Sequence, residues 1–309
     1  MASILVTGVN GFVGKHVARE LSARGHNTIG VSREPLLNPV LKDYMDDYYS
    51  CDLTDAAAVD ALPLNQIDAV INLAGLAKVG DSFANPDLYN RVNVAVLTVI
   101  GEKLISLGSK AVVIAVSTGA VYSADQEMPL TETSKLITTG SPYALSKIAM
   151  EQEAASLRIA GLNCAIVRPF NHIGPGQEGG FLVPDLYQKI LEASNKDGVI
   201  VVGDLSTRRD YTDVRDVAKA YVDLATSGTL NHSIYNVCSG RSLEGQAILN
   251  LLLSECGQTG TITVQQDPKL MRPNDPKNLF GSNQRLRTQT SWQPTIPIHQ
   301  TIHDIIAAV

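Results

Sequence analysis

Three glycines near the start of the chain restrict its fold more than any other feature. Residues 3–7 predict a short buried strand and residues 12–24 predict a helix, and the glycines follow the spacing G-x-x-G-x-x-G at the junction between them. This spacing allows a tight turn, lets the backbone approach a pyrophosphate closely, and packs the helix on the strand, so that the phosphate meets the helix N-terminus. The residues expected to bind a dinucleotide here are Gly8, Gly11, Phe12, Val13 and Gly14.

Strands and helices alternate through the first half of the chain. Apolar stretches at 27–31, 68–74, 111–116 and 163–168 predict buried strands, and a long helical pattern covers 86–107. Alternating units of this length indicate a parallel sheet with helices on both faces. The predicted fold class is therefore α/β, with a doubly wound sheet of the Rossmann type.

The alternation weakens after about residue 170, where turn residues interrupt the pattern. We expect residues 1–170, together with about 210–240, to form a cofactor-binding Rossmann domain. About 171–209 and 241–309 would then form a smaller C-terminal lobe over the sheet, which would bind the substrate.

The end of the second predicted strand indicates which dinucleotide binds. An acidic residue there would accept a hydrogen bond from the 2′-hydroxyl of NAD, whereas this chain has Ser32 and Arg33. A hydroxyl and a guanidinium suit a 2′-phosphate instead, so we predict NADP(H) as the cofactor. Further contacts are expected where later strands end, including a carboxylate that could accept from the adenine amino group. These residues are Asp52, Leu53, Ala74 and Gly75.

A proton-transfer pair is predicted in the helix that begins after Ser141, a good N-cap residue. Tyr143 and Lys147 are four residues apart and therefore share one helical face. A neighbouring ammonium favours the phenolate, which would lower the pKa of Tyr143 toward the working pH of a general acid or base. Thr118 follows a predicted strand at the edge of the sheet where ligands bind, so its hydroxyl can contact the same substrate oxygen.

The composition argues against several functional classes. The chain has 309 residues, 44% of them hydrophobic, and a formal net charge of −6. An acidic chain without clustered Lys or Arg is not expected to bind nucleic acid, and no apolar run is long enough to cross a membrane. The four cysteines are scattered without C-x-x-C spacing, so we expect no metal site, no disulfide framework and a cytoplasmic location.

Several motifs together resemble those of the extended short-chain dehydrogenase/reductases. The likeness includes the glycine turn, residues 117–122 (Ser-Thr-Gly-Ala-Val-Tyr) and Tyr143-x-x-x-Lys147, and it covers essentially the whole chain. More specific motifs lie at 168–177, 208–217, 235–240 and 271–275. These are similar to the GDP-4-dehydro-6-deoxy-D-mannose reductases, which form GDP-D-rhamnose with NADPH.

The resemblance implies a reaction, reduction of the C4 ketone of GDP-4-dehydro-6-deoxy-D-mannose to give GDP-D-rhamnose. Thr118, Tyr143 and Lys147 would be the catalytic residues, and Lys147 would also bind the nicotinamide ribose. The implied contacts to the GDP-linked 4-keto-6-deoxyhexose are Asn171, Arg209, Arg272 and Asp275. The two arginines would meet the diphosphate, because a planar guanidinium pairs bidentately with phosphate oxygens.

The resemblance also implies a homodimer that pairs through the helices at about 86–107 and 143–160. His172 is expected to pack beside the site rather than to act as a catalyst, and the role of Lys78, near the cofactor loop, stays open.

Other activities on the same fold remain open. A nucleotide-sugar 4,6-dehydratase needs an acid and a base beside the catalytic hydroxyl, whereas Gly119 and Ala120 follow Thr118. A combined 3,5-epimerase/reductase would need a cysteine in the same loop. A 4-epimerase with bound NAD uses the same three catalytic residues, although Arg33 disfavours NAD. A reductase that forms the GDP-6-deoxy-talose epimer and a non-catalytic NADP-binding protein are also compatible with these motifs.

Overall fold

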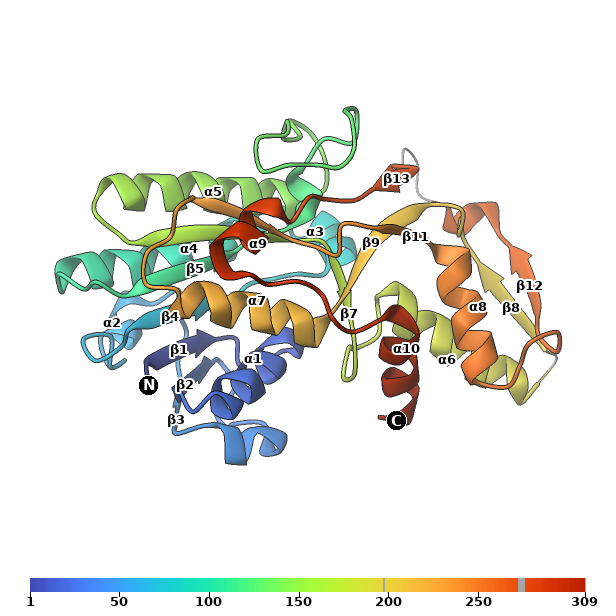
Figure 1. The fold of residues 1–309 in the computed structure, drawn as a ribbon, viewed down its shortest axis with the longest axis horizontal. Coiled ribbons are helices and arrows are strands. Elements are labelled where there is room, and N and C mark those ends of the chain that lie inside the picture. The colour runs from blue at the N-terminus through green and yellow to red at the C-terminus, as the bar shows by residue number, and fades with distance from the viewer. Residues whose placement is uncertain (197, 272–275, 309) are drawn as a thin grey trace.

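The computed structural model describes residues 1–196, 198–271 and 276–308, and a seven-stranded sheet lies at its centre (Figure 1). The strands are β1 (Ser3–Thr7), β2 (Asn27–Ser32), β3 (Asp47–Ser50), β4 (Ala69–Asn72), β5 (Val112–Val116), β6 (Cys164–Pro169) and β10 (Ile234–Val237). Their spatial order is β10–β6–β5–β4–β1–β2–β3, and all neighbours run parallel. The chain starts in the middle of the sheet and winds outward on both sides, which confirms the predicted doubly wound α/β fold.

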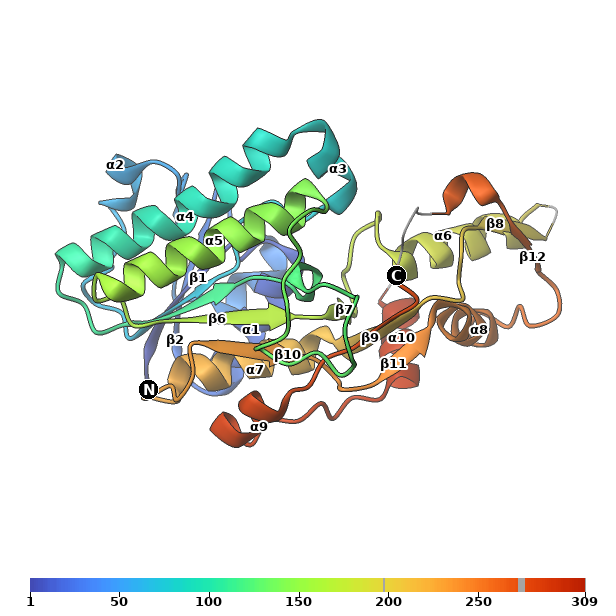
Figure 2. The same cartoon turned by 90° about the horizontal axis from the view of Figure 1, so that it is seen from above.

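Helices cover both faces of this sheet, as the view from above in Figure 2 shows. One layer contains α1 (Phe12–Ala23) and α7 (Val214–Thr226), and the other contains α2 (Ala56–Val59), α4 (Pro86–Ser106) and α5 (Pro142–Ile159). The two layers have separate apolar cores, with Leu21 and Tyr221 in the first and Leu97 and Leu157 in the second. Because both faces are covered, the central strands are almost continuously apolar.

A smaller lobe lies beyond the carboxyl ends of the central strands, on the right of Figure 1. Its helices are α6 (Leu182–Ser194), α8 (Gly245–Glu255) and α10 (Ile298–Ala307), which share a third apolar core. Its strands are β7 (Asn171–Ile173), β8 (Val199–Val202), β9 (Arg208–Asp213), β11 (Ser242–Glu244), β12 (Thr263–Gln266) and β13 (Asn278–Leu279). Strand β9 pairs with β7, β11 and β13, while β8 pairs with β12. The lobe therefore covers the edge of the sheet where parallel α/β folds bind ligands.

The division into two domains stays a proposal, and the packing of the C-terminal segment refines it. Helix α9 (Gln284–Thr290) and the residues after it return to the central sheet, because Leu286 and Trp292 lie in the core of α1 and α7. The chain then goes back to the lobe in α10. The described residues after 240 thus pack against both parts rather than the lobe alone.

Most predicted elements differ from the observed ones by one or two residues at their ends. The largest difference is the strand predicted at 68–74, because β4 ends at Asn72 and the chain leaves the sheet there. Several short helices were not predicted, namely α2, α9, α3 (Val79–Ala84), η1 (Pro39–Tyr44), η2 (Gly119–Val121) and η3 (Pro268–Leu270). Within the described residues, no helix has the length and apolarity needed to cross a membrane, and all four cysteines are free thiols.

Candidate active site

The catalytic helix α5 begins as its sequence predicts. The hydroxyl of Ser141 accepts a hydrogen bond from Ala144 N at 3.2 Å, which caps the first turn. Lys147, one turn after Tyr143, is buried, and its Nζ donates to the carbonyl of Val116 at 2.8 Å. A Cβ placed on Gly75 would lie 2.7 Å from Asn93 Oδ1 and 3.7 Å from the same Nζ. The ammonium of Lys147 therefore lies between the carboxyl ends of β4 and β5, where Asn93 leaves no room for a side chain at Gly75.

Thr118 meets Tyr143 at this edge of the sheet. Thr118 follows β5 and caps η2, where its hydroxyl accepts from Ala120 N at 3.2 Å. It also lies close enough to Tyr143 to lower the pKa of the phenol. The structure thus brings the three predicted catalytic residues together. The ring of Tyr143 also packs edge-on against Tyr89, with ring centroids 6.5 Å apart.

The protonation of Tyr143 differs from the sequence prediction. Burial raises the pKa of Tyr143, and the contact that lowers it is the hydrogen bond with Thr118, not the charge of Lys147. Burial also lowers the pKa of Lys147 to about 8, although Glu151 opposes this shift. The ammonium of Lys147 donates to the carbonyl of Val116. Tyr143 is accordingly held in its neutral form, as a proton donor requires.

The glycine turn leaves the N-terminus of α1 open to an anion. Gly8 has φ +64°, and a Cβ there would lie 3.1 Å from Ala74 N, while a Cβ on Gly14 would lie 2.5 Å from the carbonyl oxygen of Gly8. Gly11 is the N-cap residue and has no side chain to accept a hydrogen bond. The N–H groups of the first turn, at Phe12 and Val13, therefore have no side-chain cap. A pyrophosphate fits this arrangement, which no residue with a side chain at Gly14 could adopt.

The residues predicted at the adenosine end lie around the carboxyl ends of β2 and β3. Ser32 is buried and its hydroxyl accepts from Asn10 N at 3.2 Å, whereas Arg33 is exposed. Hydrogen bonds from the amide and hydroxyl of Thr54 lower the pKa of Asp52, and they occupy its Oδ1 at 3.0 and 2.7 Å. Only Oδ2 of Asp52 is then left for an adenine amino group. Leu53 is buried beside it, and Ala74 N donates to the hydroxyl of Thr7 at 3.0 Å.

The predicted substrate residues lie on the lobe side of the same edge. Asn171 is exposed on β7, and β7 pairs with β9, which carries Arg209. The guanidinium of Arg209 donates to the carbonyls of Arg208 and Pro276 at 2.8 and 2.7 Å. The structure thus places Asn171 and Arg209 on adjacent strands. Arg272 and Asp275 lie outside the described residues.

His172 packs as expected, next to the cofactor turn. Its ring stacks on that of Phe12, with centroids 6.0 Å apart and an interplanar angle of 11°. Burial lowers the pKa of His172, so the ring is neutral near pH 7, and its Nδ1 lies 3.1 Å from the carbonyl oxygen of Phe170. Nδ1 therefore carries the proton, because a carbonyl can only accept.

Sequence reasoning missed a buried asparagine that supports the site. Asn93 accepts from Leu76 N at 2.7 Å and donates to the hydroxyl of Ser146 at 2.8 Å, and that hydroxyl donates to the carbonyl of Tyr143 at 2.7 Å. Asn93 thereby joins the loop after β4 to the first turns of α5. The available signal was an amide within the apolar face of the helix predicted at 86–107.

Glu151 and Arg168 form a buried ion pair behind the site, which the sequence did not predict. Glu151 is four residues after Lys147 on α5, and Arg168 lies on β6. The sequence shows that Glu151 is one helical turn after Lys147, but it does not show that Arg168, on a different element, is the partner of Glu151.

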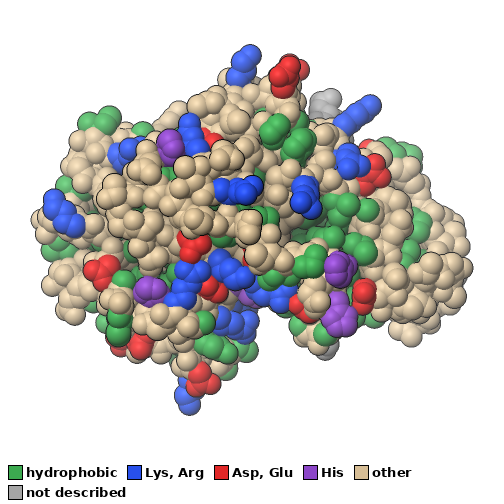
Figure 3. Space-filling model, in the orientation of Figure 1, with side chains coloured by type: hydrophobic (Ala, Val, Ile, Leu, Met, Phe, Trp, Pro, Cys, Tyr) green, Lys and Arg blue, Asp and Glu red, His purple; other side chains and the backbone are tan. Residues whose placement is uncertain are grey.

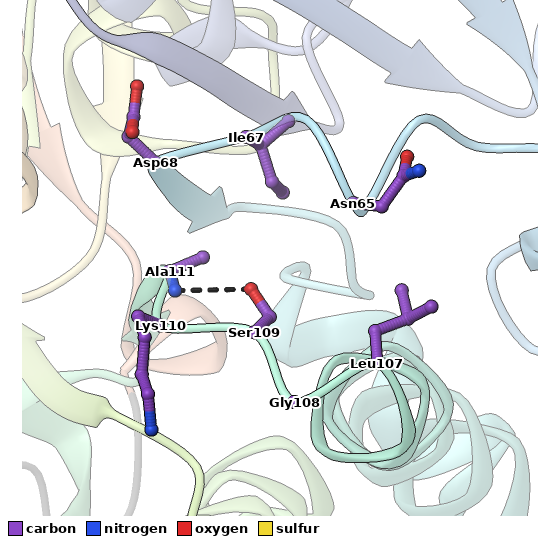
Figure 4. Close-up of a pocket in the computed structure, with 8 residues that line it drawn as sticks. All are labelled: Asn65, Ile67, Asp68, Leu107, Gly108, Ser109, Lys110 and Ala111. Atoms are coloured by element: carbon purple, nitrogen blue, oxygen red, sulfur yellow. Dashed lines mark hydrogen bonds between the residues drawn. The ribbon is translucent and has the colours of Figure 1, made fainter.

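Surface features elsewhere are separate from this site. A hollow of about 310 Å³ is lined by residues that precede β4 and β5, including Asp68, Lys110 and Ala111 (Figure 4). It lies at the amino ends of these strands, whereas Thr118 and Lys147 lie at the carboxyl ends. Figure 3 shows basic side chains over α1 and α7 with acidic ones beside them. Their ion pairs there include Arg24–Asp223 at 2.6 Å and Lys219–Asp216 at 3.1 Å.

Comparisons with known proteins match this architecture over nearly the whole chain. The GDP-6-deoxy-D-mannose reductase of Pseudomonas aeruginosa is 33% identical, over 98% of this chain and 96% of that protein. The UDP-glucose 4-epimerase of Neisseria meningitidis serogroup A is 27% identical, over 98% of this chain and 96% of its own length. The solved structure of RMD from Pseudomonas aeruginosa complexed with NADPH is 29% identical, with a TM-score of 0.85 over 100% of this chain and 98% of that one.

The profile of the NAD dependent epimerase/dehydratase family matches residues 4–238, which contain the glycine turn, Thr118, Tyr143 and Lys147. The relatives of this chain include enzymes that act on nucleotide sugars. Together with the family match, they indicate that this chain is an NAD(P)-dependent enzyme that acts on a nucleotide sugar. The chain belongs to the NAD dependent epimerase/dehydratase family, within the extended short-chain dehydrogenase/reductases.

Proposed function

We propose that the protein reduces the C4 ketone of GDP-4-dehydro-6-deoxy-D-mannose with NADPH and forms GDP-D-rhamnose. The proposal depends mainly on which side chains lie next to the Thr118 hydroxyl. Gly119 and Ala120 follow it, so among the described residues of η2 no carboxylate stands beside the hydroxyl for elimination of water. The reductase of Pseudomonas aeruginosa, at 33% identity, supports the same choice.

The residues of the site divide the chemistry between them. Tyr143, held neutral by burial, gives its proton to the oxygen that becomes the C4 hydroxyl. Thr118, beside Tyr143, donates its hydroxyl hydrogen to the same substrate oxygen, which stabilises the negative charge that develops there. Lys147 would bind the ribose of the cofactor, and its charge lies one helical turn from Tyr143.

The cofactor fits the residues that are present. The open N-terminus of α1 would hold the pyrophosphate, and Lys147, beside Gly75, would bind the nicotinamide ribose. Arg33, exposed next to Ser32, would pair with a 2′-phosphate, and neither residue offers the carboxylate that favours NAD. NADPH bound in this way supplies the hydride to C4 of the sugar.

The direct test is NADPH oxidation with GDP-4-dehydro-6-deoxy-D-mannose, with NMR of the product. NADH and a dTDP-linked 4-ketosugar serve as controls for the cofactor and the nucleotide. Turnover with the GDP sugar and NADPH, with a rhamno product, is expected. A talo product would correct the epimer and keep the reductase, whereas no NADPH consumption with any 4-ketosugar would overturn the proposal.

A 4-epimerase is the second candidate, because UDP-glucose 4-epimerases are among the relatives at 27% identity. It would use Thr118, Tyr143 and Lys147 in the same places and keep NAD bound through the cycle. Tightly bound NAD in the purified protein, with interconversion of unreduced nucleotide sugars, would favour the epimerase.

We also propose that the enzyme works in the cytoplasm as a homodimer that pairs through α4 and α5. Exposed apolar side chains support this surface, including Leu88 on α4 and Leu145 on α5. A monomer in light scattering would contradict the homodimer.

A further inference from the structure

Two buried charges lie directly behind the candidate active site. Arg168 on β6 and Glu151 on α5 form a bidentate pair, with Nε–Oε1 at 2.9 Å and Nη2–Oε2 at 2.6 Å. Their side chains are only 3% and 6% exposed. Removing two charges from water is costly, and buried pairs often add little net stability. Stability alone is therefore a poor account of this pair.

The pair contacts the strand end that carries Thr118. Ser117, the residue before it, is buried and donates its hydroxyl hydrogen to Glu151 Oε1 at 2.6 Å. This bond ties the backbone at the end of β5 to α5, the helix that carries Tyr143. The carboxylate of Glu151 thus links the backbone next to Thr118 to the helix that carries Tyr143.

Glu151 also faces the catalytic lysine. Tyr143, Lys147 and Glu151 follow one another at intervals of four residues, so they form one stripe on α5. Burial lowers the pKa of Lys147, and Glu151 is the charge that raises it again. Although burial disfavours the charge of Arg168 too, its hydrogen bonds with Glu151 raise the pKa of its guanidinium. Arg168 is therefore always charged, and the carboxylate of Glu151 stands between two cations.

The far side of Arg168 is also fully engaged. Its guanidinium lies over the ring of Tyr122, 4.8 Å from the centroid, and Nη1 reaches the carbonyl of Glu132 at 3.4 Å. Tyr122 donates to Asn236 Oδ1 at 2.7 Å, and Glu132 Oε1 accepts from Asn236 N at 2.9 Å. Arg168 is thus fixed by β6, β10 and the segment after Thr118.

We propose that Glu151 is a positioning residue of the active site, which fixes the end of β5 at Thr118 and faces Lys147 with a negative charge. Arg168 holds this carboxylate in place. The other ionisable groups around the stripe are Tyr143 and Tyr89 near Lys147, and Tyr122, Glu132 and Arg285 around Arg168. Among these described groups, Glu151 is therefore the carboxylate that shares a helical face with Lys147. The catalytic consequence of this role rests on the proposed function, but the charge effect on Lys147 does not.

The test is the titration of Lys147 in the E151Q variant of the full chain. Lysine labelled with ¹³C at Cε is followed by NMR against pH, and the signal of Lys147 is assigned from its loss in a Lys147→Arg variant. Glutamine keeps the size of the side chain and an acceptor for Ser117 but removes the charge. We expect the pKa of Lys147 to fall relative to the wild type, by up to about one unit, because the neutral glutamine no longer favours the charged lysine. An unchanged titration would overturn the proposal.

A double variant keeps the test decisive if E151Q leaves Arg168 unpaired and does not fold. E151Q/R168M removes both charges together, which avoids a lone buried charge. Because Glu151 and not Arg168 is the charge that shifts Lys147, the pKa of Lys147 should again lie below that of the wild type. A value equal to or above the wild type would contradict the role of Glu151.

The Ser117→Ala variant tests the positioning part separately, since it keeps both charges and removes one hydrogen bond. We expect the titration of Lys147 to stay as in the wild type while kcat falls about fivefold, the equivalent of one ordinary hydrogen bond. An unchanged kcat would remove the positioning part of the proposal. The NMR titration needs neither substrate nor turnover, so a failure of the GDP-sugar assay and a failure of this inference can be told apart.

Discussion

The two sides of the candidate site are built in different ways. On the sheet side, Thr118, Tyr143 and Lys147 come from two neighbouring elements, and the buried Lys147 donates to the carbonyl of Val116 at 2.8 Å. On the lobe side, Asn171 is exposed and Arg209 lies on the adjacent strand β9. The sheet side thus buries its charged group, whereas the lobe side exposes Asn171 and holds the guanidinium of Arg209 through two backbone carbonyls.

This difference indicates how the family can keep one chemistry and change its substrates. Groups that transfer a proton must be placed within a few tenths of an ångström, which buried elements provide. Groups that recognise the nucleotide sugar can come from segments distant in sequence, such as β7 and β9. We therefore expect substitutions on the sheet side to affect kcat and substitutions on the lobe side to affect KM.

The largest effect is expected for Tyr143→Phe. It removes the proton donor but keeps the ring that packs against Tyr89, so kcat should fall about 10²–10⁴-fold. NADPH binding, followed by fluorescence titration, should stay close to the wild type. Tyr89→Phe is the matched control, because it removes one phenol that donates to the carbonyl of Lys78. Similar losses of kcat in both variants would mean that the effect is structural.

The next largest effect is expected on the lobe side, for Arg209→Ala. Loss of a charged hydrogen bond to the diphosphate costs about 1.5–3 kcal/mol, so the KM for the GDP sugar should rise about 10–100-fold with little change in kcat. Arg208→Ala is the control on the neighbouring residue, whose partly exposed ion pair with Glu244 contributes little. If kcat fell and KM did not, the contrast between the two sides would be wrong.

The sheet side could largely be predicted from the sequence because its determinants are local. The glycine turn, the N-cap Ser141 and the interval from Tyr143 to Lys147 each operate within one turn or one strand–helix junction. The parallel sheet could be predicted from the alternation of apolar strands and helices, because two parallel strands are usually joined by a helix that crosses over the sheet. The pKa direction of Tyr143 could not be predicted, because it depends on burial by distant segments and on the carbonyl that Lys147 reaches.

The lobe side depends on long-range contacts that a single sequence does not display. Neither the pairing of β7 with β9 nor the return of Trp292 to the core of α7 follows from local patterns. The ion pair of Glu151 and Arg168 is similar, since the two residues are 17 positions apart and on different elements. Arg272 and Asp275, expected from the resemblance, lie outside the described residues and stay predictions.

A smaller effect is expected at the adenosine end, for Arg33→Ala. The KM for NADPH should rise about tenfold, the effect of one charged hydrogen bond, while the KM for NADH should be nearly unchanged. Lys42→Ala removes an exposed cation from η1 nearby and is the matched control. Equal weakening of both cofactors would show that Arg33 does not contact the 2′-phosphate and would favour the epimerase.

The smallest effect is expected from pH. Burial lowers the pKa of Lys147 to about 8 and raises that of Tyr143, so the lysine loses its charge first as the pH rises. Reduction consumes a proton and uses the charged lysine, so kcat/KM for NADPH, which reports the free enzyme, should be constant below pH 7 and fall to roughly half near pH 8. In Lys147→Arg, whose guanidinium stays charged, the fall near pH 8 should disappear; a fall that persists there would assign the titration to another group and weaken the contrast between the buried charge of the sheet side and the exposed groups of the lobe side.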